Sequence, residues 1–199
     1  AFGSHPRGRE FESLQVHQKS RSHGIMYHGC GFLVYVKSRG GVMDISFVLG
    51  EAKFNYRVGA VMLNGDRLLA MRDERSPYLY LPGGRVKLGE TAEQAIIREI
   101  QEELHVTAEI VRPLWLNQAF FKEDTDGLRY HELCVYFLLD VSNTGLPSSG
   151  DRFCLTEGER CSFEWLSFEP LKDEYFYPAF LKEAIFHLPE NFTLRTELE

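Results

Sequence analysis

The sequence lacks any long apolar run. No stretch approaches the roughly 18 consecutive apolar residues that a membrane-spanning helix requires. The longest apolar run near the N-terminus, Gly31 to Val36, is short even for the core of a signal peptide, and no obvious small-residue cleavage site follows it. The sequence therefore favours neither a membrane protein nor a secreted one, and we expect no membrane partner.

Paired cysteines are also missing. The chain of 199 residues has 4 cysteines, Cys30, Cys134, Cys154 and Cys161, and none of them belongs to a Cys-x-x-Cys pair. This spacing argues against a zinc ribbon, a thioredoxin-like redox motif and a dense disulfide framework. A reducing compartment fits this cysteine usage best, and we predict a cytoplasmic protein.

Basic residues are outnumbered by acidic ones beyond the first 42 residues. Residues 1–42 hold six Lys or Arg against two Glu, a net charge of +4, while the whole chain carries −7, so residues 43–199 carry −11. Clustered Lys and Arg are what hold phosphate backbones, so the acidic body argues against a nucleic-acid polymer as partner. An acidic surface suits a site that gathers divalent cations, although it most often serves only solubility.

Residues 1–42 also lack a sustained period of 2 or 3.6 residues. They are rich in Ser, His, Arg and Gly, and Gly3-Ser4-His5 resembles what remains of a cleaved tag. We predict a leader at residues 1–42, tag-derived or disordered, and a single domain at residues 43–199. An N-terminal strand from Phe32 to Val36 is the alternative.

Residues 43–199 contain several strand patterns and two helix patterns. Phe54–Leu63 and Arg67–Arg72 read as strands of a hairpin, because Asn64 and Gly65 both tolerate a positive φ in the turn between them. A long loop is expected at 141–158. The remaining predicted elements are strands at Tyr78–Leu81, Val106–Phe121, Leu133–Leu139 and Ser162–Leu166, and a closing helix at Ala179–Leu188.

The clearest helix pattern runs from Ala92 to Leu104, without Gly or Pro, after a capping box of Thr91 and Gln94. At about 100° per residue its isoleucines and Leu104 share one face, which we expect to pack on a sheet. An adjoining stripe is acidic and also holds the small Ala92 and Ala95, which leave room above it. The acidic residues of this stripe are Glu99, Glu102 and Glu103.

Like charges at these spacings destabilise a helix by about 0.2 to 0.5 kcal/mol per pair, so the acidic stripe calls for solvation or for a cation. Mg²⁺ takes carboxylate oxygens together with phosphate oxygens of a substrate. Arg98 stands one turn before Glu102, at a spacing that allows a charge-assisted hydrogen bond to orient it. Taken alone, the stripe is better explained as a solvated charged face.

The spacing to the preceding residues is more specific. Glu90 follows Gly84 after five residues, and seven residues later comes Arg98-Glu99-Ile100-x-Glu102-Glu103-x-x-Val106. This resembles the signature of the Nudix hydrolases, Gly-x5-Glu-x7-Arg-Glu-U-x-Glu-Glu-x-Gly-U with U aliphatic, and Gly83 supplies the customary preceding glycine. His105 departs from it, since the family usually has glycine there as a left-handed helix cap. Histidine costs about 1 kcal/mol at such a cap but occupies no ligand position.

The resemblance covers roughly residues 53–190. It implies an α/β/α sandwich around a mixed, curved sheet. It also implies that Glu99, Glu102 and Glu103, with the backbone carbonyl of Gly83, bind Mg²⁺ or Mn²⁺, while Arg98 and Glu90 brace the helix and the loop. The implied reaction is hydrolysis of a nucleoside diphosphate linked to another moiety, in which water attacks phosphorus.

Two candidates for the general base stay open. Glu99 is one, because it stands on the helix beside the implied metal. Family members often place another acidic residue shortly before a tryptophan-containing strand, and here Glu159 and Glu157 precede Trp165. The resemblance thus makes Glu99, Glu102, Glu103, Arg98 and Glu159 the candidate catalytic residues.

The substrate is harder to predict. Arg57 and Arg85 are candidates to hold phosphate or ribose, and aromatic side chains are candidates to stack a base, although aromatic residues in strands most often belong to the core. The aromatic candidates are Tyr78, Tyr80, Phe120, Phe121, Tyr130 and Trp165. We select Arg57, Arg85, Phe121 and Tyr80 as substrate-binding residues. His131 and Glu132 are interpreted as a hydrogen-bonded structural pair rather than a catalytic one.

Two other classes of function stay open beside a hydrolase acting on a small nucleotide. A non-catalytic nucleotide-binding regulatory module would be expected to lose motif glutamates, and none is lost here. An isoprenoid diphosphate isomerase on the same fold would need a positioned cysteine acid, whereas Cys134 lies in an apolar strand and resembles a core residue. A homodimer is possible for any of these.

Overall fold

The computed structural model describes residues 43–74, 76–123, 126–155 and 161–198. The predicted leader at 1–42, with its alternative strand at Phe32–Val36, lies outside these residues, as do Glu157 and Glu159. The domain boundary at residue 43 therefore stays a prediction. In the described part of the chain, no helix is both long and apolar enough to cross a membrane.

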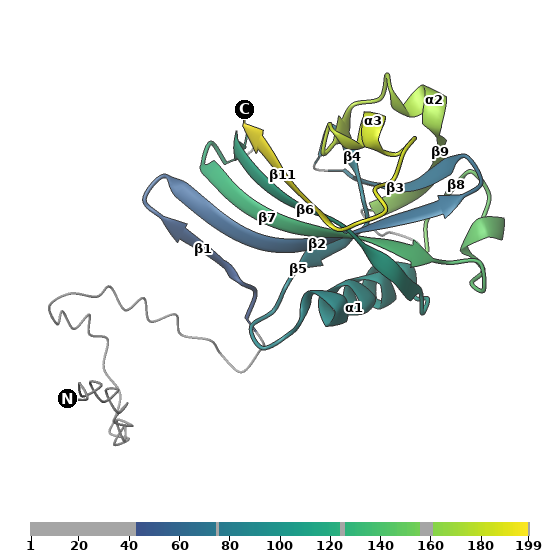
Figure 1. Ribbon diagram of the computed structural model, residues 1–199, viewed down its shortest axis with the longest axis horizontal. Coiled ribbons are helices and arrows are strands. Elements are labelled where there is room, and N and C mark those ends of the chain that lie inside the picture. The colour runs from purple at the N-terminus through teal and green to yellow at the C-terminus, as the bar shows by residue number, and fades with distance from the viewer. Residues whose placement is uncertain (1–42, 75, 124–125, 156–160, 199) are drawn as a thin grey trace, which may run out of the picture. The chain divides into compact units, whose positions relative to one another are not determined.

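The first sheet is mixed and curved, and the long strand β2 runs through it (Figure 1). Its strands are β1 (Ser46–Leu49), β2 (Ala52–Asn64), β5 (Gly83–Arg85), β6 (Glu109–Lys122), β7 (Arg129–Asp140) and β11 (Thr193–Leu198). β7 pairs in parallel with one edge of β2, while β1 and β5 pair antiparallel with the other edge. β6 continues the sheet beyond β7, and β11 adds to β6 in parallel. The predicted mixed, curved sheet of an α/β fold is confirmed.

A second sheet branches from the end of β2. It contains β3 (Arg67–Asp73), β4 (Leu79–Tyr80), β8 (Arg152–Phe153), β9 (Cys161–Ser167) and β10 (Phe176–Tyr177). β3 pairs antiparallel with β2 only at its first residues and then with β9 along its length. β4 joins β3 to β10 at the far edge.

The predicted hairpin of β2 and β3 is confirmed, but its turn lies one residue later than predicted. Asn64 pairs with Arg67 as the last residue of β2, so Gly65 and Asp66 form the turn. Only Gly65 of these residues has a positive φ, +64°. A single glycine therefore supplies the left-handed conformation that the turn requires.

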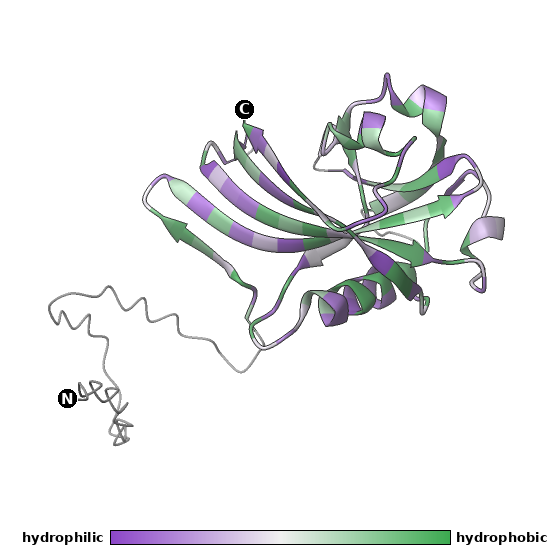
Figure 2. Ribbon diagram, viewed as in Figure 1, coloured by the Kyte–Doolittle hydropathy of each residue, from purple (hydrophilic) through white to green (hydrophobic). Residues whose placement is uncertain are grey.

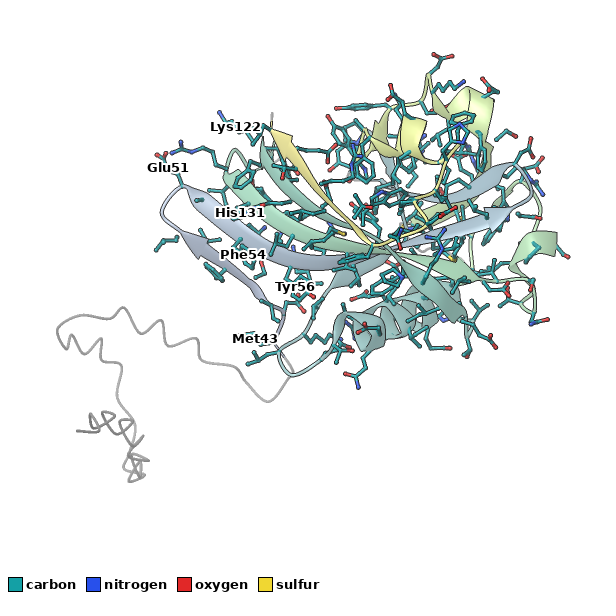
Figure 3. The ribbon with its side chains drawn as sticks, in the orientation of Figure 1. Met43, Glu51, Phe54, Tyr56, Lys122 and His131 are labelled. Atoms are coloured by element: carbon teal, nitrogen blue, oxygen red, sulfur yellow. The ribbon has the colours of Figure 1, made fainter. Side chains whose placement is uncertain are left out.

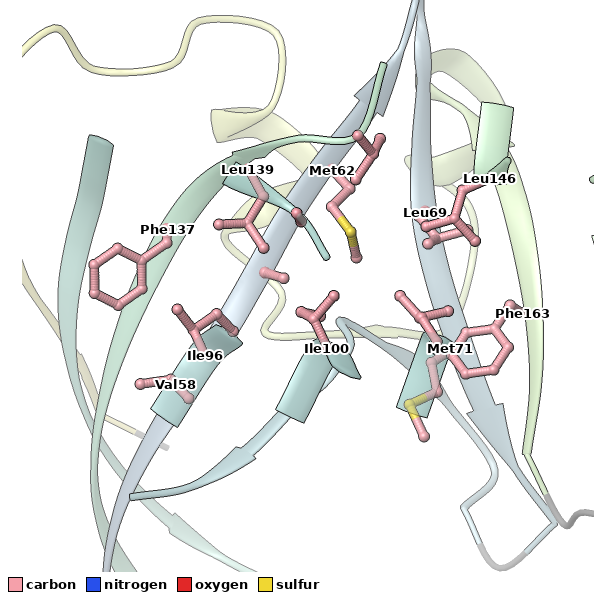
Figure 4. Close-up of a cluster of buried hydrophobic side chains, with 14 of the residues drawn as sticks. Val58, Met62, Leu69, Met71, Ile96, Ile100, Phe137, Leu139, Leu146 and Phe163 are labelled. Carbon is pink, nitrogen blue, oxygen red and sulfur yellow. The ribbon is translucent and has the colours of Figure 1, made fainter. Parts of the chain in front are cut away.

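Helix α1 (Ala92–Leu104) has the predicted bounds, and Thr91 and Gln94 form the predicted capping box. Its apolar face covers one face of the first sheet. Figure 4 shows Ile96 and Ile100 of α1 against Val58, Met62 and Phe137 of the sheet. Alternate residues of β2 and β7 face the other way, where they pack with the short helices α2 (Phe168–Leu171) and α3 (Leu181–Ala184). The resulting order of helix, sheet and helix matches the predicted sandwich.

The main errors in the predicted elements lie near the ends of the domain. The predicted closing helix is only the short α3, because turns closed by bonds between residues i and i+3 flank it on both sides. The edge strands β1 and β11 were not predicted, since their side chains are mostly exposed and carry little apolar periodicity, as the mixed colours of β11 show (Figure 2). The predicted loop at 141–158 contains a 3₁₀ turn at Leu146–Ser148 and strand β8.

Candidate active site

Two glycines bring β5 into close contact with β2 and α1. Gly83 has a φ of +142°, and a Cβ there would lie 2.3 Å from the carbonyl oxygen of Val58. A Cβ on Gly84 would lie 2.3 Å from the carboxyl carbon of Glu99. Any larger residue would displace backbone at Gly83 and the Glu99 carboxylate at Gly84. The glycine pair therefore seats Glu99 directly against the loop before the helix.

Arg98 joins helix α1 to this loop through several nitrogens of its guanidinium. Nε and Nη2 donate to the two oxygens of Glu90 at 2.7 and 2.9 Å, and Nη2 also donates to the carbonyl of Arg85 at 3.0 Å. Nη1 donates to Glu99 at 2.6 Å and to Glu102 at 3.2 Å, so the predicted contact between Arg98 and Glu102 is confirmed. The hydrogen bonds from Arg98 lower the pKa of Glu90 and keep it charged.

The three glutamates of the acidic stripe have different environments. The side chain of Glu99 is 14% exposed, whereas that of Glu102 is 54% exposed. Oε2 of Glu103 accepts a hydrogen bond from the backbone N–H of Gly83 at 2.9 Å. Burial, helped by the charge of Glu99, raises the pKa of Glu103 to about 7 against the opposing effect of that hydrogen bond.

The buried face of α1 is wider than predicted. Ala95 is fully buried in the core with Ile96, Ile100 and Leu104, rather than lying open on the acidic stripe. Glu99, one turn further along the helix, consequently lies at the margin of the core rather than in the middle of an exposed face. The space above the stripe is therefore set by the glycines of β5 and not by small residues of the helix.

Glu99, Glu102 and Glu103 fit a hard divalent cation by their chemistry, since such cations prefer carboxylate oxygens. Across the described residues, no three His, Cys, Asp or Glu side chains converge as a preassembled metal site. Two of these glutamates instead contact Arg98, and Glu103 contacts Gly83. The donor set therefore fits a hard divalent cation by its chemistry.

His105 ends helix α1 in the left-handed region, with φ 55° and ψ 26°. It is the only non-glycine with a positive φ among the described residues. Its Nδ1 lies 3.3 Å from the carbonyl of Gln101, one turn back. The left-handed conformation that glycine would favour is thus kept with histidine in its place.

Arg57 and Arg85 lie directly beside each other on β2 and β5. Together with Asp44, Gly84 and Glu99 they line a hollow of about 310 Å³, called here the Glu99 hollow. Burial opposes the charge of Arg57, but the carboxylate of Glu132 and other neighbours outweigh it and raise the pKa of Arg57. The guanidinium of Arg85 lies 3.5 Å from the carboxylate of Asp44, and its Nε is buried without a hydrogen-bond partner in the described structure.

The same two arginines line a second, larger cavity of about 470 Å³, called here the aromatic cavity. All four residues selected as substrate-binding, Arg57, Arg85, Phe121 and Tyr80, line it. Tyr78, Phe120 and Tyr130 line it as well. Trp165 does not, because it is buried in the core on the side of α1 and donates to the carbonyl of Leu146 at 3.1 Å.

The predicted pairing of His131 with Glu132 is wrong. Adjacent residues of a strand point to opposite faces, and each of these has another partner. His131, labelled in Figure 3, contacts Gln118 and stacks on Phe120 with ring centroids 4.3 Å apart. Glu132 accepts a hydrogen bond from the amide of Asn55 at 3.2 Å and lines the aromatic cavity.

Sequence reasoning missed two asparagines. Asn55 and Asn117 are almost fully buried in β2 and β6 and line the aromatic cavity. A buried amide must find hydrogen-bond partners, so a polar residue inside an apolar strand is the signal that would have identified them. Glu197, which bonds to Asn117, was missed because strand β11 was not predicted.

A family model described as the NUDIX domain matches residues 53–185, about two thirds of the chain. The chain belongs to the Nudix family. It is 32% identical over 97 residues to the ADP-ribose pyrophosphatase of Methanocaldococcus jannaschii, a match that covers 47% of this chain and 55% of that protein. It is 55% identical over 29 residues to the 8-oxo-dGTP diphosphatase of Escherichia coli, which covers 15% of this chain and 22% of that one. The chain thus matches about half or less of the length of these relatives.

A solved structure shows the same fold. The MutT protein from Bacillus halodurans superimposes with a TM-score of 0.52 at 12% identity, over 71% of this chain and 88% of that one. At this identity the similarity concerns the arrangement of strands and helices. The predicted Nudix-type fold is confirmed.

Proposed function

We propose that this protein is a metal-dependent hydrolase that cleaves the diphosphate of a small nucleotide derivative, releasing a nucleotide. The names of the relatives, an ADP-ribose pyrophosphatase and an 8-oxo-dGTP diphosphatase, are those of enzymes that cleave such bonds in nucleotides. Membership of the Nudix family supports the same reaction class.

One observation carries the proposal: Arg57 and Arg85 line both the Glu99 hollow and the aromatic cavity. Guanidinium groups bind phosphate oxygens through two parallel hydrogen bonds. A diphosphate held by this arginine pair would have one end at the acidic stripe and the other at the aromatic cavity. This is the arrangement that a nucleoside diphosphate linked to another moiety requires.

Glu99, Glu102 and Glu103, with the carbonyl of Gly83, would hold Mg²⁺ or Mn²⁺. Such an ion, when bound, neutralises the diphosphate and lowers the pKa of the attacking water. Arg98 and Glu90 are positioning residues, because their hydrogen bonds fix the helix to the loop and hold Glu99 and Glu102. The proton of the attacking water passes to a carboxylate, either Glu99 or Glu159.

The setting of the reaction follows from the charge and the cysteines. In the described part of the chain no disulfide joins Cys134, Cys154 or Cys161, and reduced thiols of this kind fit a reducing cytoplasm. We propose a small nucleotide as substrate and no nucleic-acid polymer as partner, since residues 43–199 are acidic.

Burial raises the pKa of Cys134 to about 12, so its thiol stays protonated at neutral pH.

The test is a screen of nucleotide derivatives with Mg²⁺ or Mn²⁺, with phosphate detected after coupling to a phosphatase or a pyrophosphatase. Glu103→Gln keeps the shape of the side chain but removes a ligand charge, and we expect it to lose at least about 100-fold in kcat. The control is Glu93→Gln, an exposed glutamate in the first turn of the same helix, which should keep its activity. Near-normal turnover of Glu103→Gln in saturating Mg²⁺ would reject the metal site.

A further inference from the structure

A row of large side chains crosses the first sheet on the face that carries α1. The strand register places in this row one residue from each of β1, β2, β7, β6 and β11, namely Phe47, Phe54, His131, Phe120 and Leu198. Its rings are in contact, because the centroids of successive rings from Phe47 to Phe120 lie 5.2, 5.6 and 4.3 Å apart. We call this set the Phe54 row.

The Phe54 row lies beyond the end of α1. Tyr56 and Val58 belong to the core under the helix, and Phe54 faces the same way by the alternation of β2. Figure 3 shows Phe54 and His131 on the part of the sheet that extends away from α1, with Tyr56 nearer to the helix. Neither core cluster of the described residues includes a member of the row. Within the described part of the chain, this stretch of the face therefore lacks a second layer.

The side chains of this stretch are apolar and exposed. Phe47 is 52% exposed and Leu198 is 78% exposed, and Leu49 and Leu194 on the same face are exposed as well. The next row towards α1 adds no charged residue, since it consists of Tyr56, Leu133, Gln118 and Thr196. We call the two rows together the open face. A continuous exposed apolar surface of this kind is typical of a protein contact.

Opposite charges flank the open face along the strands. At the strand ends away from α1, Arg129 and Lys122 are paired in register, and both are exposed. The ion pair of Arg129 with Glu51, at 3.6 Å, is exposed on both sides and holds Arg129 only weakly. At the other end is Glu93, an exposed residue of the first turn of α1. Burial raises the pKa of Tyr56 and the charge of Glu93 raises it as well, which agrees with a position of Glu93 beside the open face.

We propose that the open face binds a second copy of this chain, with the two open faces stacked about a two-fold axis that lies across the strands. Such an axis reverses the strand direction between the copies. Each basic end then meets the acidic end of the other copy, so Arg129 lies opposite the partner subunit's Glu93. A surface that is apolar in the middle and oppositely charged at its two ends complements itself in this way.

The shape of the domain selects the same axis. Stacked sheets lie about 10 Å apart and a helix is about 10 to 12 Å across, so the partner's sheet would lie in the same layer as α1. With the strand direction reversed, the partner's strands end where α1 begins. With the strands of the two copies running the same way, the partner's sheet would collide with α1. Sterics and charge therefore agree on one arrangement.

Sedimentation velocity of the full chain at increasing concentration is the test. We expect a species of twice the 23.0 kDa mass of the chain, with a dissociation constant on the order of 10 μM or tighter. Phe47→Glu places a charge in the contact and should weaken dimerisation at least about 10-fold. Val48→Glu is the matched control, because Val48 is 57% exposed on the same edge strand but points to the opposite face.

Leu198→Glu repeats the test on the far edge of the open face. Leu198 is more exposed than Phe47 and its ring contacts are none, so its replacement should leave the fold intact even if Phe47→Glu does not. We expect the same loss of dimerisation, at least about 10-fold.

A charge exchange tests the orientation of the two copies. Arg129→Glu and Glu93→Lys should each weaken dimerisation by about threefold to tenfold, since two-fold symmetry repeats each contact. The double variant restores opposite charges and should return to within about twofold of the wild type. Two weak single variants whose double variant is weaker still would overturn the proposed axis.

Several results would overturn the contact itself. A monomer at every concentration would do so, and a monomer in which Phe47→Glu lowers Tm far more than Val48→Glu would indicate that residues 1–42 cover the face instead. A dimer that both Phe47→Glu and Leu198→Glu leave intact, or that Val48→Glu weakens equally, would place the contact elsewhere. None of these measurements involves hydrolysis, so they leave the proposed function to its own test.

Discussion

The two faces of the first sheet differ in how far apart along the chain their functional residues lie. On the face that carries α1, the glycines, the bracing arginine and the glutamates all come between Gly83 and Glu103. On the opposite face, the cavity draws on strands from β2 to β11, between Asn55 and Glu197. One face is thus a local motif, and the other exists only after the sheet has formed.

This difference explains which mutations should separate chemistry from recognition. Residues on the α1 face should control kcat and metal affinity. Residues on the cavity face should control KM and the choice of nucleotide. The predictions below test this division, beginning with the largest expected effect.

The general base could break the division, because Glu159 is far in the sequence from the motif between Gly83 and Glu103 and lies outside the described residues. If Glu159 accepts the proton, Glu159→Gln should lower kcat by about 10² to 10⁴-fold and remove the acidic limb of the pH–rate profile. Its dissociation constant for Mg²⁺ should stay near normal, since the implied ligands are on α1. If Glu99 is the base, Glu99→Gln should change both kcat and metal affinity.

Glu157→Gln is the companion variant for this experiment. A normal kcat in both Glu157→Gln and Glu159→Gln would return the proton transfer to helix α1. All the chemistry would then lie on one face of the sheet.

Gly84→Ala should be nearly as damaging, although it removes no functional group. The new Cβ would lie 2.3 Å from the Glu99 carboxyl carbon and force that side chain aside. A displacement of about 1 Å at a reacting centre can cost 100-fold in rate, so we expect kcat to fall by about that factor. Gly145→Ala is the control, because a Cβ at Gly145 would have no neighbour within 4 Å among the described residues and the φ there is −74°.

The contrast between the faces also explains how much the sequence could predict. Helix α1, its cap and the contact between Arg98 and Glu102 depend on residues close in the chain, and all were predicted correctly. Arg57, Arg85, Tyr80 and Phe121 were chosen by residue type, but nothing in the sequence indicated that strand pairing would bring them to one cavity. Asn117 and Glu197 were missed because their contact requires β11, an exposed edge strand with little apolar periodicity.

Gly59→Ala is the counterpart of Gly84→Ala on the cavity face and should have a smaller effect. Its Cβ would lie 2.7 Å from the ring of Tyr136, which lines the cavity. Overpacking of this kind costs about 1 to 3 kcal/mol of stability, and the displaced ring should raise KM several-fold with little change in kcat. Steady-state kinetics beside urea unfolding would measure both. A loss confined to kcat would contradict the division between the faces.

His105 should matter least, although it stands inside the motif. Its φ of 55° costs a non-glycine residue about 1 kcal/mol, offset in part by the contact of Nδ1 with the Gln101 carbonyl. His105→Gly relieves the backbone strain but loses that contact and gains entropy in the unfolded chain, so we expect a net rise in Tm of no more than about 2 °C. His105→Ala keeps the strain and loses the contact, so its Tm should fall. Both variants should retain wild-type kcat and metal affinity, because His105 ends the helix without touching the glutamates. A large loss of activity in His105→Gly, with Tm unchanged, would show that the helix end takes part in the chemistry of the α1 face.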